Sequence, residues 1–393
     1  MADERIKLIR EYEEKIRKYA ESDKNKYRLS HWTSFPGAEK NQPHGLPVKS
    51  DKLVYLFNPD QAFFSNVLNY SMVKFYTDPV EYVLRAFQRS IFMFETFDTL
   101  NPIGKVIGFW AGVGFEPSVM GLPQQFTEED AWIGRDPIIK ERIPVEQIEI
   151  PDFYTNPATI EVLDFYNRMK ETVSEDFDVY LPTLYRSPWG IAWAIRGIED
   201  LLIDCMEDPE WAFAFVDRIA DCRISWDTQR AKYFGQDGLA PSNLYNDEVA
   251  APPLSPGIYR DIVLPSEIKV SEAYGGINYW HSCGDTTHFY EDINKIPNVG
   301  IVHVSPWCDL ERALEVYDNP LVFEYALHPI ADVLVNDDNK AFIDTRLRSI
   351  REALRGRYSL LRADGWGKPL KGNDYDIKRL QYWISRANEI CLS

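Results

Sequence analysis

The second half of the sequence alternates short apolar segments with longer amphipathic ones, and this alternation constrains the fold more than any other feature. The apolar segments predict strands at residues 179–184, 238–245, 276–280, 300–304, 321–326 and 358–361. The segments between and around them predict helices at residues 158–174, 192–206, 209–233, 256–273, 286–296, 310–317 and 339–354. Parallel strands need a crossover connection, which is usually a helix, so a series of such units predicts an α/β fold, a closed (β/α)8 TIM barrel.

The first part of the chain predicts a helical extension ahead of the barrel. Residues 3–21 carry apolar side chains three and four positions apart, which is typical of an amphipathic helix. We expect this helix to lie on the barrel or on a second subunit of a homodimer. Residues 63–94 read as helical, with Asp78-Pro79 at the start of the second half, and residues 100–104 read as a strand end that turns into a loop. The predicted organisation is an extension at residues 1–54 followed by a barrel at residues 55–393.

Composition excludes several classes of partner. The 393 residues carry a formal net charge of −18, which leaves no basic surface for a nucleic acid. No apolar run approaches the roughly 18 residues of a membrane span. Five scattered cysteines are too few for a disulfide framework in a chain of this length, so we expect a cytoplasmic protein in a reducing compartment.

In a (β/α)8 barrel the catalytic groups lie where the strands end and the following loops begin. Several polar side chains of this sequence follow predicted strands and would gather on one rim of the barrel. These side chains are Tyr185, Arg186, Asp247, Glu248, His281, Cys283, Cys308, His328, Arg362 and Asp364.

His281 and Cys283 are two positions apart at the end of an aromatic strand, so their side chains should lie on the same face. Gly284 would then let the backbone turn and expose both groups. An imidazole and a thiolate suit zinc better than magnesium or calcium, which prefer oxygen ligands. The alternative is a core histidine beside an inert buried cysteine.

A zinc site needs a third and sometimes a fourth protein ligand. Cys308, Asp364, Glu248 and His328 are within reach by topology, and Cys308 is the best chemical match because a second thiolate would favour zinc strongly. The alternative for Cys308 is an ordinary loop thiol.

Asp247 and Glu248 are adjacent, so only one of them would face the barrel mouth in an extended chain. That carboxylate is predicted to be a general acid or to orient His281, and the alternative is a solvated acidic pair. Arg186 is predicted to pair with a substrate anion, and the alternative is a structural salt bridge.

Aromatic residues near the strand ends predict the walls of a substrate pocket. The predicted substrate-binding residues are Tyr185, Trp189, Tyr245, Trp280, Trp307 and Arg362. Such a pocket would suit an aryl methyl ether or a quaternary amine. The alternative is that several of these rings fill the core.

Two segments resemble a known family. Residues 254–265 (LSPGIYRDIVLP) followed by residues 275–285 (GGINYWHSCGD) resemble the uroporphyrinogen decarboxylase superfamily, and more closely its cobalamin-dependent methyltransferase branch. Residues 182–197 and the helix start at residues 207–210 are similar to further family segments, so the resemblance covers roughly residues 55–393.

The resemblance implies a TIM barrel in which His281 and Cys283 hold zinc. The zinc would activate the heteroatom of a methyl donor or an acceptor thiol, and the methyl group would pass to or from a corrinoid (cobalamin) carried by a separate small protein. Two features depart from the family pattern. Trp366 occupies the place where a further cysteine is expected, and the arginine-rich signature that binds porphyrinogen carboxylates is absent.

The sequence therefore predicts a zinc-dependent methyltransferase that acts on a small O-methyl or N-methyl compound. One alternative is a metal-independent decarboxylase or lyase that uses Asp247 or Glu248 as its acid and Arg186 or Arg362 to hold a carboxylate. The other alternative is a barrel that binds a ligand or a partner without catalysis.

Overall fold

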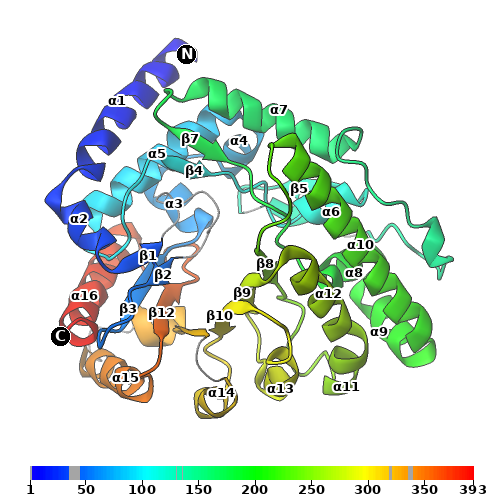
Figure 1. The fold of residues 1–393 in the computed structure, drawn as a ribbon. Coiled ribbons are helices and arrows are strands. Elements are labelled where there is room, and N and C mark those ends of the chain that lie inside the picture. The colour runs from blue at the N-terminus through cyan, green and yellow to red at the C-terminus, as the bar shows by residue number, and fades with distance from the viewer. Residues whose placement is uncertain (1, 35–44, 130, 135, 318–320, 335–339) are drawn as a thin grey trace.

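The structure is a computed structural model that describes residues 2–34, 45–129, 131–134, 136–317, 321–334 and 340–393. In the described residues eight parallel strands form a ring that helices surround (Figure 1). Six of these strands form one hydrogen-bonded sheet in the order β3-β12-β11-β10-β9-β8, and β4 pairs with β7. The strands are β3 (Val54–Asn58), β4 (Val106–Gly108), β7 (Asp178–Tyr180), β8 (Ser242–Tyr245), β9 (Ile277–His281), β10 (Val299–Val304), β11 (Val322–Ala326) and β12 (Ser359–Asp364).

Backbone hydrogen bonds join the strand pair to the sheet on one side, between β7 and β8, whereas in the described residues no backbone pairing joins β4 to β3. Between β7 and β8, the Tyr245 amide donates to the Tyr185 carbonyl at 2.8 Å, and the Ser187 amide donates to the Tyr245 carbonyl at 2.9 Å. The pairing of β12 with β3 joins the last strand to the first. This arrangement confirms the predicted (β/α)8 barrel.

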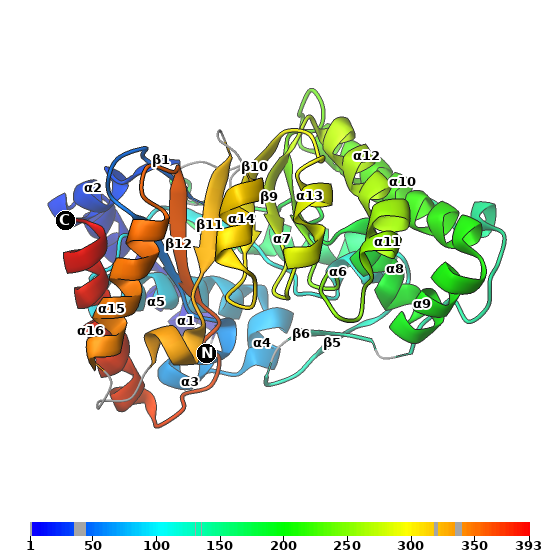
Figure 2. The same ribbon diagram turned by 90° about the horizontal axis from the view of Figure 1, so that it is seen from below.

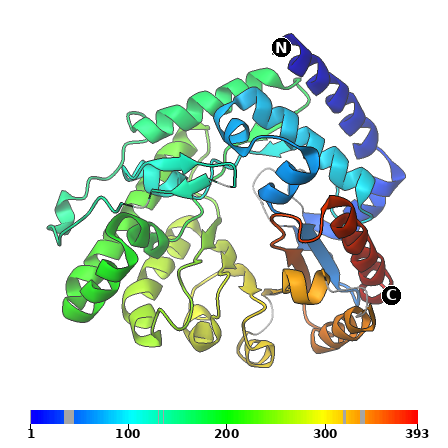
Figure 3. The same ribbon diagram turned by 180° about the vertical axis from the view of Figure 1, so that it is seen from behind.

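The helices lie outside the ring of strands (Figures 1 and 3). Seen from below, α13, α14 and α15 lie in front of the strands β9 to β12 (Figure 2). The helices are α1 (Ala2–Ala20), α2 (Asp23–Leu29), α3 (Gln61–Leu68), α4 (Met72–Thr77), α5 (Pro79–Thr96), α6 (Phe115–Val119), α7 (Pro157–Thr172), α8 (Pro188–Arg196), α9 (Ile198–Glu207), α10 (Pro209–Tyr233), α11 (Pro256–Ile258), α12 (Leu264–Tyr274), α13 (Tyr290–Ile293), α14 (Leu310–Val316), α15 (Lys340–Ala353) and α16 (Asn373–Cys391). Two small antiparallel pairs, β1 (Trp32–Ser34) with β2 (Leu46–Pro47) and β5 (Gln124–Phe126) with β6 (Ala131–Ile133), lie outside the barrel.

Several of the helices, among them α5, α7, α8 and α10, begin with the same local signal, a capping side chain followed by proline. Asp78, Asn156, Ser187 and Asp208 each accept a hydrogen bond from a backbone amide of the first turn, and a proline follows each of them. The side-chain oxygen satisfies an amide that has no partner within the helix, and proline at the first helical position lacks the amide that would otherwise be unpaired.

The structure corrects several predicted boundaries. Residues 63–94 form three helices, α3 to α5, and the predicted helix at 192–206 is divided at Gly197, whose φ of 88° a residue with a side chain rarely adopts. Only Tyr290–Ile293 of the predicted helix 286–296 is α-helical. Strand β3 was not predicted, and β4 begins two residues after the segment 100–104 that was expected to be a strand end. Asn339, the predicted start of the last crossover helix, lies outside the described residues.

Helix α1 lies on the barrel, along α5 (Figure 1). Arg5 forms an ion pair with Asp78 at 2.6 Å, and the ring of Tyr19 stacks on Phe94 with centroids 4.7 Å apart. Glu13 is fully buried and accepts a hydrogen bond from the Ser174 amide at 2.7 Å. Among the described residues, no helix has the length and apolar character needed to cross a membrane.

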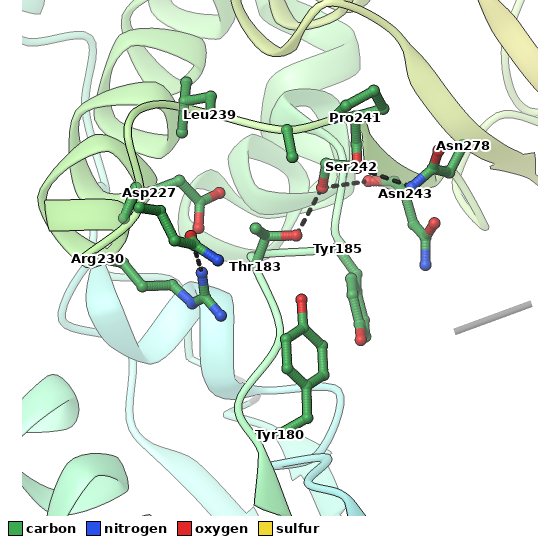
Figure 4. Close-up of a pocket in the computed structure, with 13 residues that line it drawn as sticks. Tyr180, Thr183, Tyr185, Asp227, Arg230, Leu239, Pro241, Ser242, Asn243 and Asn278 are labelled. Atoms are coloured by element: carbon green, nitrogen blue, oxygen red, sulfur yellow. Dashed lines mark hydrogen bonds between the residues drawn. The ribbon is translucent and has the colours of Figure 1, made fainter. Parts of the chain in front are cut away.

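The seam between β7 and β8 is filled mostly by polar side chains (Figure 4). Thr183 Oγ1 and Ser242 Oγ are 2.7 Å apart, and an Arg223 nitrogen donates to the Leu184 carbonyl at 2.6 Å. A cavity of about 20 Å³ remains beside Asn243, whose buried amide has no partner in the described part of the chain. A cavity of this size holds about one water molecule, which the amide of Asn243 would bind.

Candidate metal centre

Strand β9 directs alternate side chains to opposite sides of the barrel wall. Tyr279 and His281 face the interior, where the Tyr279 hydroxyl lies 3.0 Å from His281 Nδ1. Trp280 faces the helices, and its indole nitrogen donates to Glu267 Oε2 at 3.0 Å. Cys283 lies two residues beyond His281, at the carboxyl end of the strand where the barrel opens.

Asp247, His281 and Cys283 come together at this end of the barrel. His281 Nε2 is 3.2 Å from Cys283 Sγ and 3.3 Å from Asp247 Oδ1, and the Cys283 amide donates to Asp247 Oδ1 at 3.3 Å. Among the described residues these three form the group whose ligand atoms all lie within 4.8 Å of one another. His281 is buried, whereas Asp247 and Cys283 are exposed at the barrel mouth.

The loop after β9 packs closely against the loop after β8. A Cβ atom on Gly284 would lie 2.2 Å from the Cβ of Ala250, which is closer than two such atoms can approach. Gly284 does not have a positive φ, so the backbone conformation does not require glycine here as the sequence predicted. Glycine is required because a side chain would clash with Ala250. This contact holds the loop of Cys283 against the loop that carries Asp247.

Tyr279 sets the orientation of the His281 imidazole. The Tyr279 hydroxyl donates a hydrogen bond to Glu324 Oε1 at 2.5 Å. Its oxygen can therefore only accept a hydrogen bond from His281. His281 Nδ1 then carries the hydrogen that bridges the 3.0 Å distance to Tyr279. In the neutral imidazole this leaves a lone pair on Nε2, the atom that faces Asp247 and Cys283.

A buried polar network supports Tyr279 from below. Glu324 Oε1 accepts from His303 Nδ1 at 2.9 Å, and an Arg362 nitrogen lies 3.4 Å from Glu324 Oε2. Burial, assisted by the charge of His281, lowers the pKa of His303 to about 4. A neutral His303 and a charged Arg362–Glu324 pair therefore form the floor of the site.

The pKa values of Asp247 and Cys283 are shifted in opposite directions. Partial removal from water within the barrel mouth would by itself raise the pKa of Asp247, but the hydrogen bond and charge that His281 supplies when it is protonated, together with the charge of Arg186, outweigh this effect and hold the pKa well below its usual range. Partial removal from water by the surrounding barrel, followed by the charge of Asp247, raises the pKa of the Cys283 thiol well above its ordinary value. A cation placed between these groups would stabilise both anionic forms.

The donor set fits a zinc ion. A carboxylate oxygen, an imidazole nitrogen and a thiol sulfur converge, and zinc accepts all three donor types. Three protein ligands leave a fourth position free for a substrate, which is the usual arrangement of a catalytic zinc site.

The adjacent carboxylates of Asp247 and Glu248 diverge. Asp247 faces His281, whereas Glu248 forms an ion pair with Arg186 in which both side chains are largely buried. Tyr245 completes the wall beside the cluster, with its ring centroid 4.9 Å from that of His281 and 5.8 Å from that of Tyr185. Tyr185 and Tyr245 thus lie next to the cluster, and Arg186 is neutralised by Glu248.

The four further candidate ligands, Cys308, Asp364, His328 and the Glu248 described above, are not part of the cluster. The sulfur of Cys308 accepts from the Thr286 amide at 3.3 Å and lies 3.3 Å from Ser305 Oγ, and the side chain is buried between the loops after β9 and β10. Asp364 pairs with Arg362, although its charge still contributes to the raised pKa of Cys283. The ring of His328 accepts from the amides of residues 330 and 331 and caps the following helical turn.

The predicted aromatic wall is only partly formed. Trp189 and Trp280 are fully buried, Trp189 in the hydrophobic core and Trp280 against Glu267, so the prediction that they line a pocket at the mouth is wrong. Trp307 is 59% exposed, and its ring lies edge-on to His328. Trp366 also belongs to the core, where it packs on Phe57 with ring centroids 4.9 Å apart.

Three residues of the site, Tyr279, His303 and Glu324, were not predicted from the sequence. A signal for each was present, because Tyr279 precedes His281 by two positions and therefore shares its face. Glu324 and His303 are polar residues within strands that are otherwise apolar, and buried polar groups of this kind need partners.

Comparisons with known proteins identify the family. The family model described as uroporphyrinogen decarboxylase (URO-D) matches residues 106–335, which is more than half of the chain. A methylated-thiol–coenzyme M methyltransferase of Methanosarcina mazei is 27% identical over 153 residues, which is 34% of this chain and 38% of that protein. The match thus spans less than half of the length of that relative.

A solved structure is similar to most of the chain. A methyltransferase from Methanosarcina mazei superposes with a TM-score of 0.61 at 13% sequence identity, covering 87% of this chain and 95% of that one. At this identity the similarity shows a shared fold. The family match, the eight-stranded barrel and the segment around His281 together place the chain in the uroporphyrinogen decarboxylase family.

Proposed function

We propose that this protein is a zinc-dependent methyltransferase of the uroporphyrinogen decarboxylase family. The observation that carries the proposal is the convergence of Asp247, His281 and Cys283 at the carboxyl ends of β8 and β9. The partial similarity to a methylated-thiol–coenzyme M methyltransferase and the shared fold with a second methyltransferase support the same reaction class.

In this proposal Asp247, His281 and Cys283 hold the zinc ion. When bound, zinc supplies a Lewis acid for the heteroatom of a methyl donor, or lowers the pKa of an acceptor thiol so that a thiolate exists near neutral pH. Tyr279 keeps the lone pair of His281 Nε2 directed at the cluster. The buried floor of His303, Glu324 and Arg362 holds Tyr279 in place and keeps water away from this side of the site.

The substrate is proposed to be a small compound that carries a methyl group on oxygen or nitrogen. Tyr185 and Tyr245 present aromatic surface beside the cluster, which suits an apolar or cationic methyl donor. The methyl group would move without its bonding electrons, which stay on the donor atom, and the receiving nucleophile would supply the new pair. We infer that the second substrate is a corrinoid on a separate small protein, or a thiol.

The decarboxylase alternative receives less support from the site. It requires Arg186 or Arg362 to hold a substrate carboxylate, but each of these guanidinium groups already pairs with a carboxylate of the chain. Glu248, a proposed acid in that alternative, is also held by Arg186.

Metal analysis and an activity assay test the proposal together. We expect one zinc ion per chain in protein purified without a metal-affinity tag, and zinc-dependent loss of the methyl–cobalt absorption when free methylcobalamin and 2-mercaptoethanol are added. In that reaction the thiolate takes the methyl group, and cob(I)alamin keeps the electron pair of the broken bond.

Matched variants separate the cluster from its surroundings. His281→Ala and Cys283→Ala should lose zinc and activity, whereas His288→Ala at an exposed position and Cys308→Ala outside the cluster should keep the zinc. Stoichiometric zinc in His281→Ala would contradict the metal assignment. Full zinc without methyl transfer to any of a panel of thiols and corrinoids would contradict the reaction class.

A further inference from the structure

The barrel wall contains an interruption between β3 and β4. In the described residues β3 pairs with β12 and β4 pairs with β7, and no backbone pairing joins β3 to β4. The side chain of Asn101 replaces the missing neighbour, since its Oδ1 accepts from the Phe57 amide at 3.2 Å and its Nδ2 donates to the Phe57 carbonyl at 2.8 Å. Because this side chain satisfies both backbone groups, the interruption is a stable feature of the fold.

A cavity of about 280 Å³ occupies this interruption. One face of α5 lines it through residues that include Tyr82, Ala86 and Arg89, and Asn58 and Trp110 lie at the carboxyl ends of the two strands. A space of this volume holds several water molecules. The cavity is therefore large enough for a small organic ligand.

The charges around the cavity have one sign. Arg28 and Arg89 line it, and none of the other lining residues carries a carboxylate, in a chain whose net charge is −18. Arg28 is 2% exposed, and burial lowers its pKa to about 10. The Asp98 carboxylate lies 4.0 Å from the Arg28 guanidinium, and the Asp98 side chain is 80% exposed to solvent.

Arg89 is the better placed of the two arginines for a ligand. The terminal nitrogens of Arg28 donate to the carbonyls of Asn101 and Phe97, at 2.9 and 2.8 Å. Arg89 donates to the side chain of Gln61, and within the described residues it has no carboxylate within 4.0 Å and its buried Nε has no partner. Its guanidinium carbon lies 4.5 Å from the ring centroid of Phe64, so the charged group is held in place by an aromatic ring.

The remaining walls are mixed. Aromatic rings form much of the apolar part, those of Phe57, Phe64, Phe87, Phe94 and Trp110, and polar side chains such as Asn58, Gln61 and Ser90 also line the cavity. Arg89 is half-buried, with a buried Nε and no carboxylate within 4.0 Å among the described residues, which favours an anion, and aromatic walls favour an apolar body attached to it.

We propose that this cavity binds a small aromatic or apolar organic anion, whose acidic group pairs with Arg89 and whose body packs between α5 and β4. The proposal concerns a site separate from the Asp247–His281–Cys283 cluster and does not depend on methyl transfer.

Calorimetric titration of the full chain tests the proposal with three probes. Benzoate and phenylphosphonate carry an acidic group on an aromatic ring, and benzamide is a neutral analogue of similar shape. We expect at least one of the two anions to bind with a 1:1 stoichiometry and benzamide to bind at least about tenfold more weakly, because a charge-assisted hydrogen bond contributes that much affinity.

Variants on one helix locate the site. Arg89→Gln should weaken binding of the anion by about tenfold or more. Arg85→Gln should leave it unchanged, because Arg85 lies one turn away on α5, pairs with Glu81 and does not line the cavity. Ala86→Leu should block binding by filling the cavity without changing its charge.

Zinc content distinguishes this result from the metal centre. We expect Arg89→Gln to retain zinc and a wild-type unfolding profile while it loses the anion. The proposal is overturned if neither anion binds at millimolar concentration, if benzamide binds as well as benzoate, or if both Arg89→Gln and Ala86→Leu bind the anion with wild-type affinity.

Discussion

The orientation of a single imidazole governs the candidate metal centre. His281 presents Nε2 to Asp247 and Cys283 because Nδ1 is engaged by Tyr279. Tyr279 is fixed in turn by its hydrogen bond to Glu324. A partner on the second ring nitrogen is a general device for setting the tautomer and basicity of a metal-binding histidine.

Replacement of Tyr279 by phenylalanine tests this role. Tyr279→Phe should reduce zinc affinity by about 10-fold to 100-fold, the usual effect of losing a group that orients a ligand. Competition with a zinc chelator measures the affinity. Tyr290→Phe is the control, because the Tyr290 hydroxyl contacts the Asp309 carbonyl on the outer helix layer. Equal affinities in the two variants would show that Tyr279 does not position His281.

At the residue scale, the sequence was informative where spacing determines geometry. His281 and Cys283 were predicted to share a face because they are two positions apart in a strand, and the structure places their ligand atoms 3.2 Å apart. Cys308 was expected to join them because it follows a neighbouring strand, but it lies four residues beyond β10. Its direction depends on the turn in which its amide donates to the Ser305 carbonyl, and spacing along the chain does not predict that turn.

At the element scale, the contact between β9 and α12 contains a buried acid. Glu267 is fully buried, and its Oε2 accepts from the Tyr259 hydroxyl at 2.9 Å and from Trp280 at 3.0 Å. Burial raises the pKa of Glu267 to about 7, although both hydrogen bonds act in the opposite direction. The folded chain therefore keeps this proton to a higher pH than the unfolded chain does.

This raised pKa predicts a pH dependence of stability. Between about pH 4.5 and pH 7 the unfolded chain loses the proton of Glu267 first, so the free energy of unfolding should fall as the pH rises through this window, by roughly 3 kcal/mol at most. Glu267→Gln should remove this fall. The free energy of unfolding of the variant minus that of wild type should therefore be more positive at pH 8 than at pH 4. Urea unfolding at several pH values measures it.

The exposed glutamate Glu272 on the same helix provides the control. Glu272→Gln should follow the wild-type pH dependence. If the free energy of unfolding of wild type and Glu267→Gln depends on pH in the same way, the pKa of Glu267 is the same in the folded and unfolded chains, which contradicts the prediction.

The interruption between β3 and β4 gives a second prediction for an element. Asn101→Ala would leave the buried amide and carbonyl of Phe57 without their partners, so we expect a loss of about 1 to 3 kcal/mol in the free energy of unfolding. Hydrogen exchange at the Phe57 amide should accelerate in parallel. Asn66→Ala on the surface of α3 should change neither quantity, and unchanged exchange in Asn101→Ala would show that water already satisfies Phe57.

At the scale of the whole molecule, the regular half of the chain predicted the fold. The alternation after residue 155 located strands β7 to β12, and together they indicated a barrel. Strands β3 and β4 were not predicted for physical reasons. The four residues Val54–Phe57 of β3 are all buried, so they show no alternation, and Val106–Gly108 is only three residues long.

The barrel also explains why distant residues meet. Asp247 and His281 come from neighbouring strands whose carboxyl ends share one rim, and the register that pairs Tyr245 with His281 sets Asp247 beside them. The sequence predicted this gathering at the rim, but not which side chains face inward beyond the strand ends. Trp280 alternates with Tyr279 and His281 along β9 and therefore faces the helices, and Trp189 packs into the core from α8.

In the proposed function, Asp247, His281 and Cys283 hold a zinc ion at the barrel mouth. Anomalous diffraction from crystals of the zinc-loaded protein, measured on both sides of the zinc absorption edge, tests it most directly. We expect a single strong peak about 2.0 to 2.3 Å from His281 Nε2, Cys283 Sγ and an Asp247 oxygen. Fully loaded crystals with no peak at these three atoms, or with a peak that Cys283 does not contact, would contradict it.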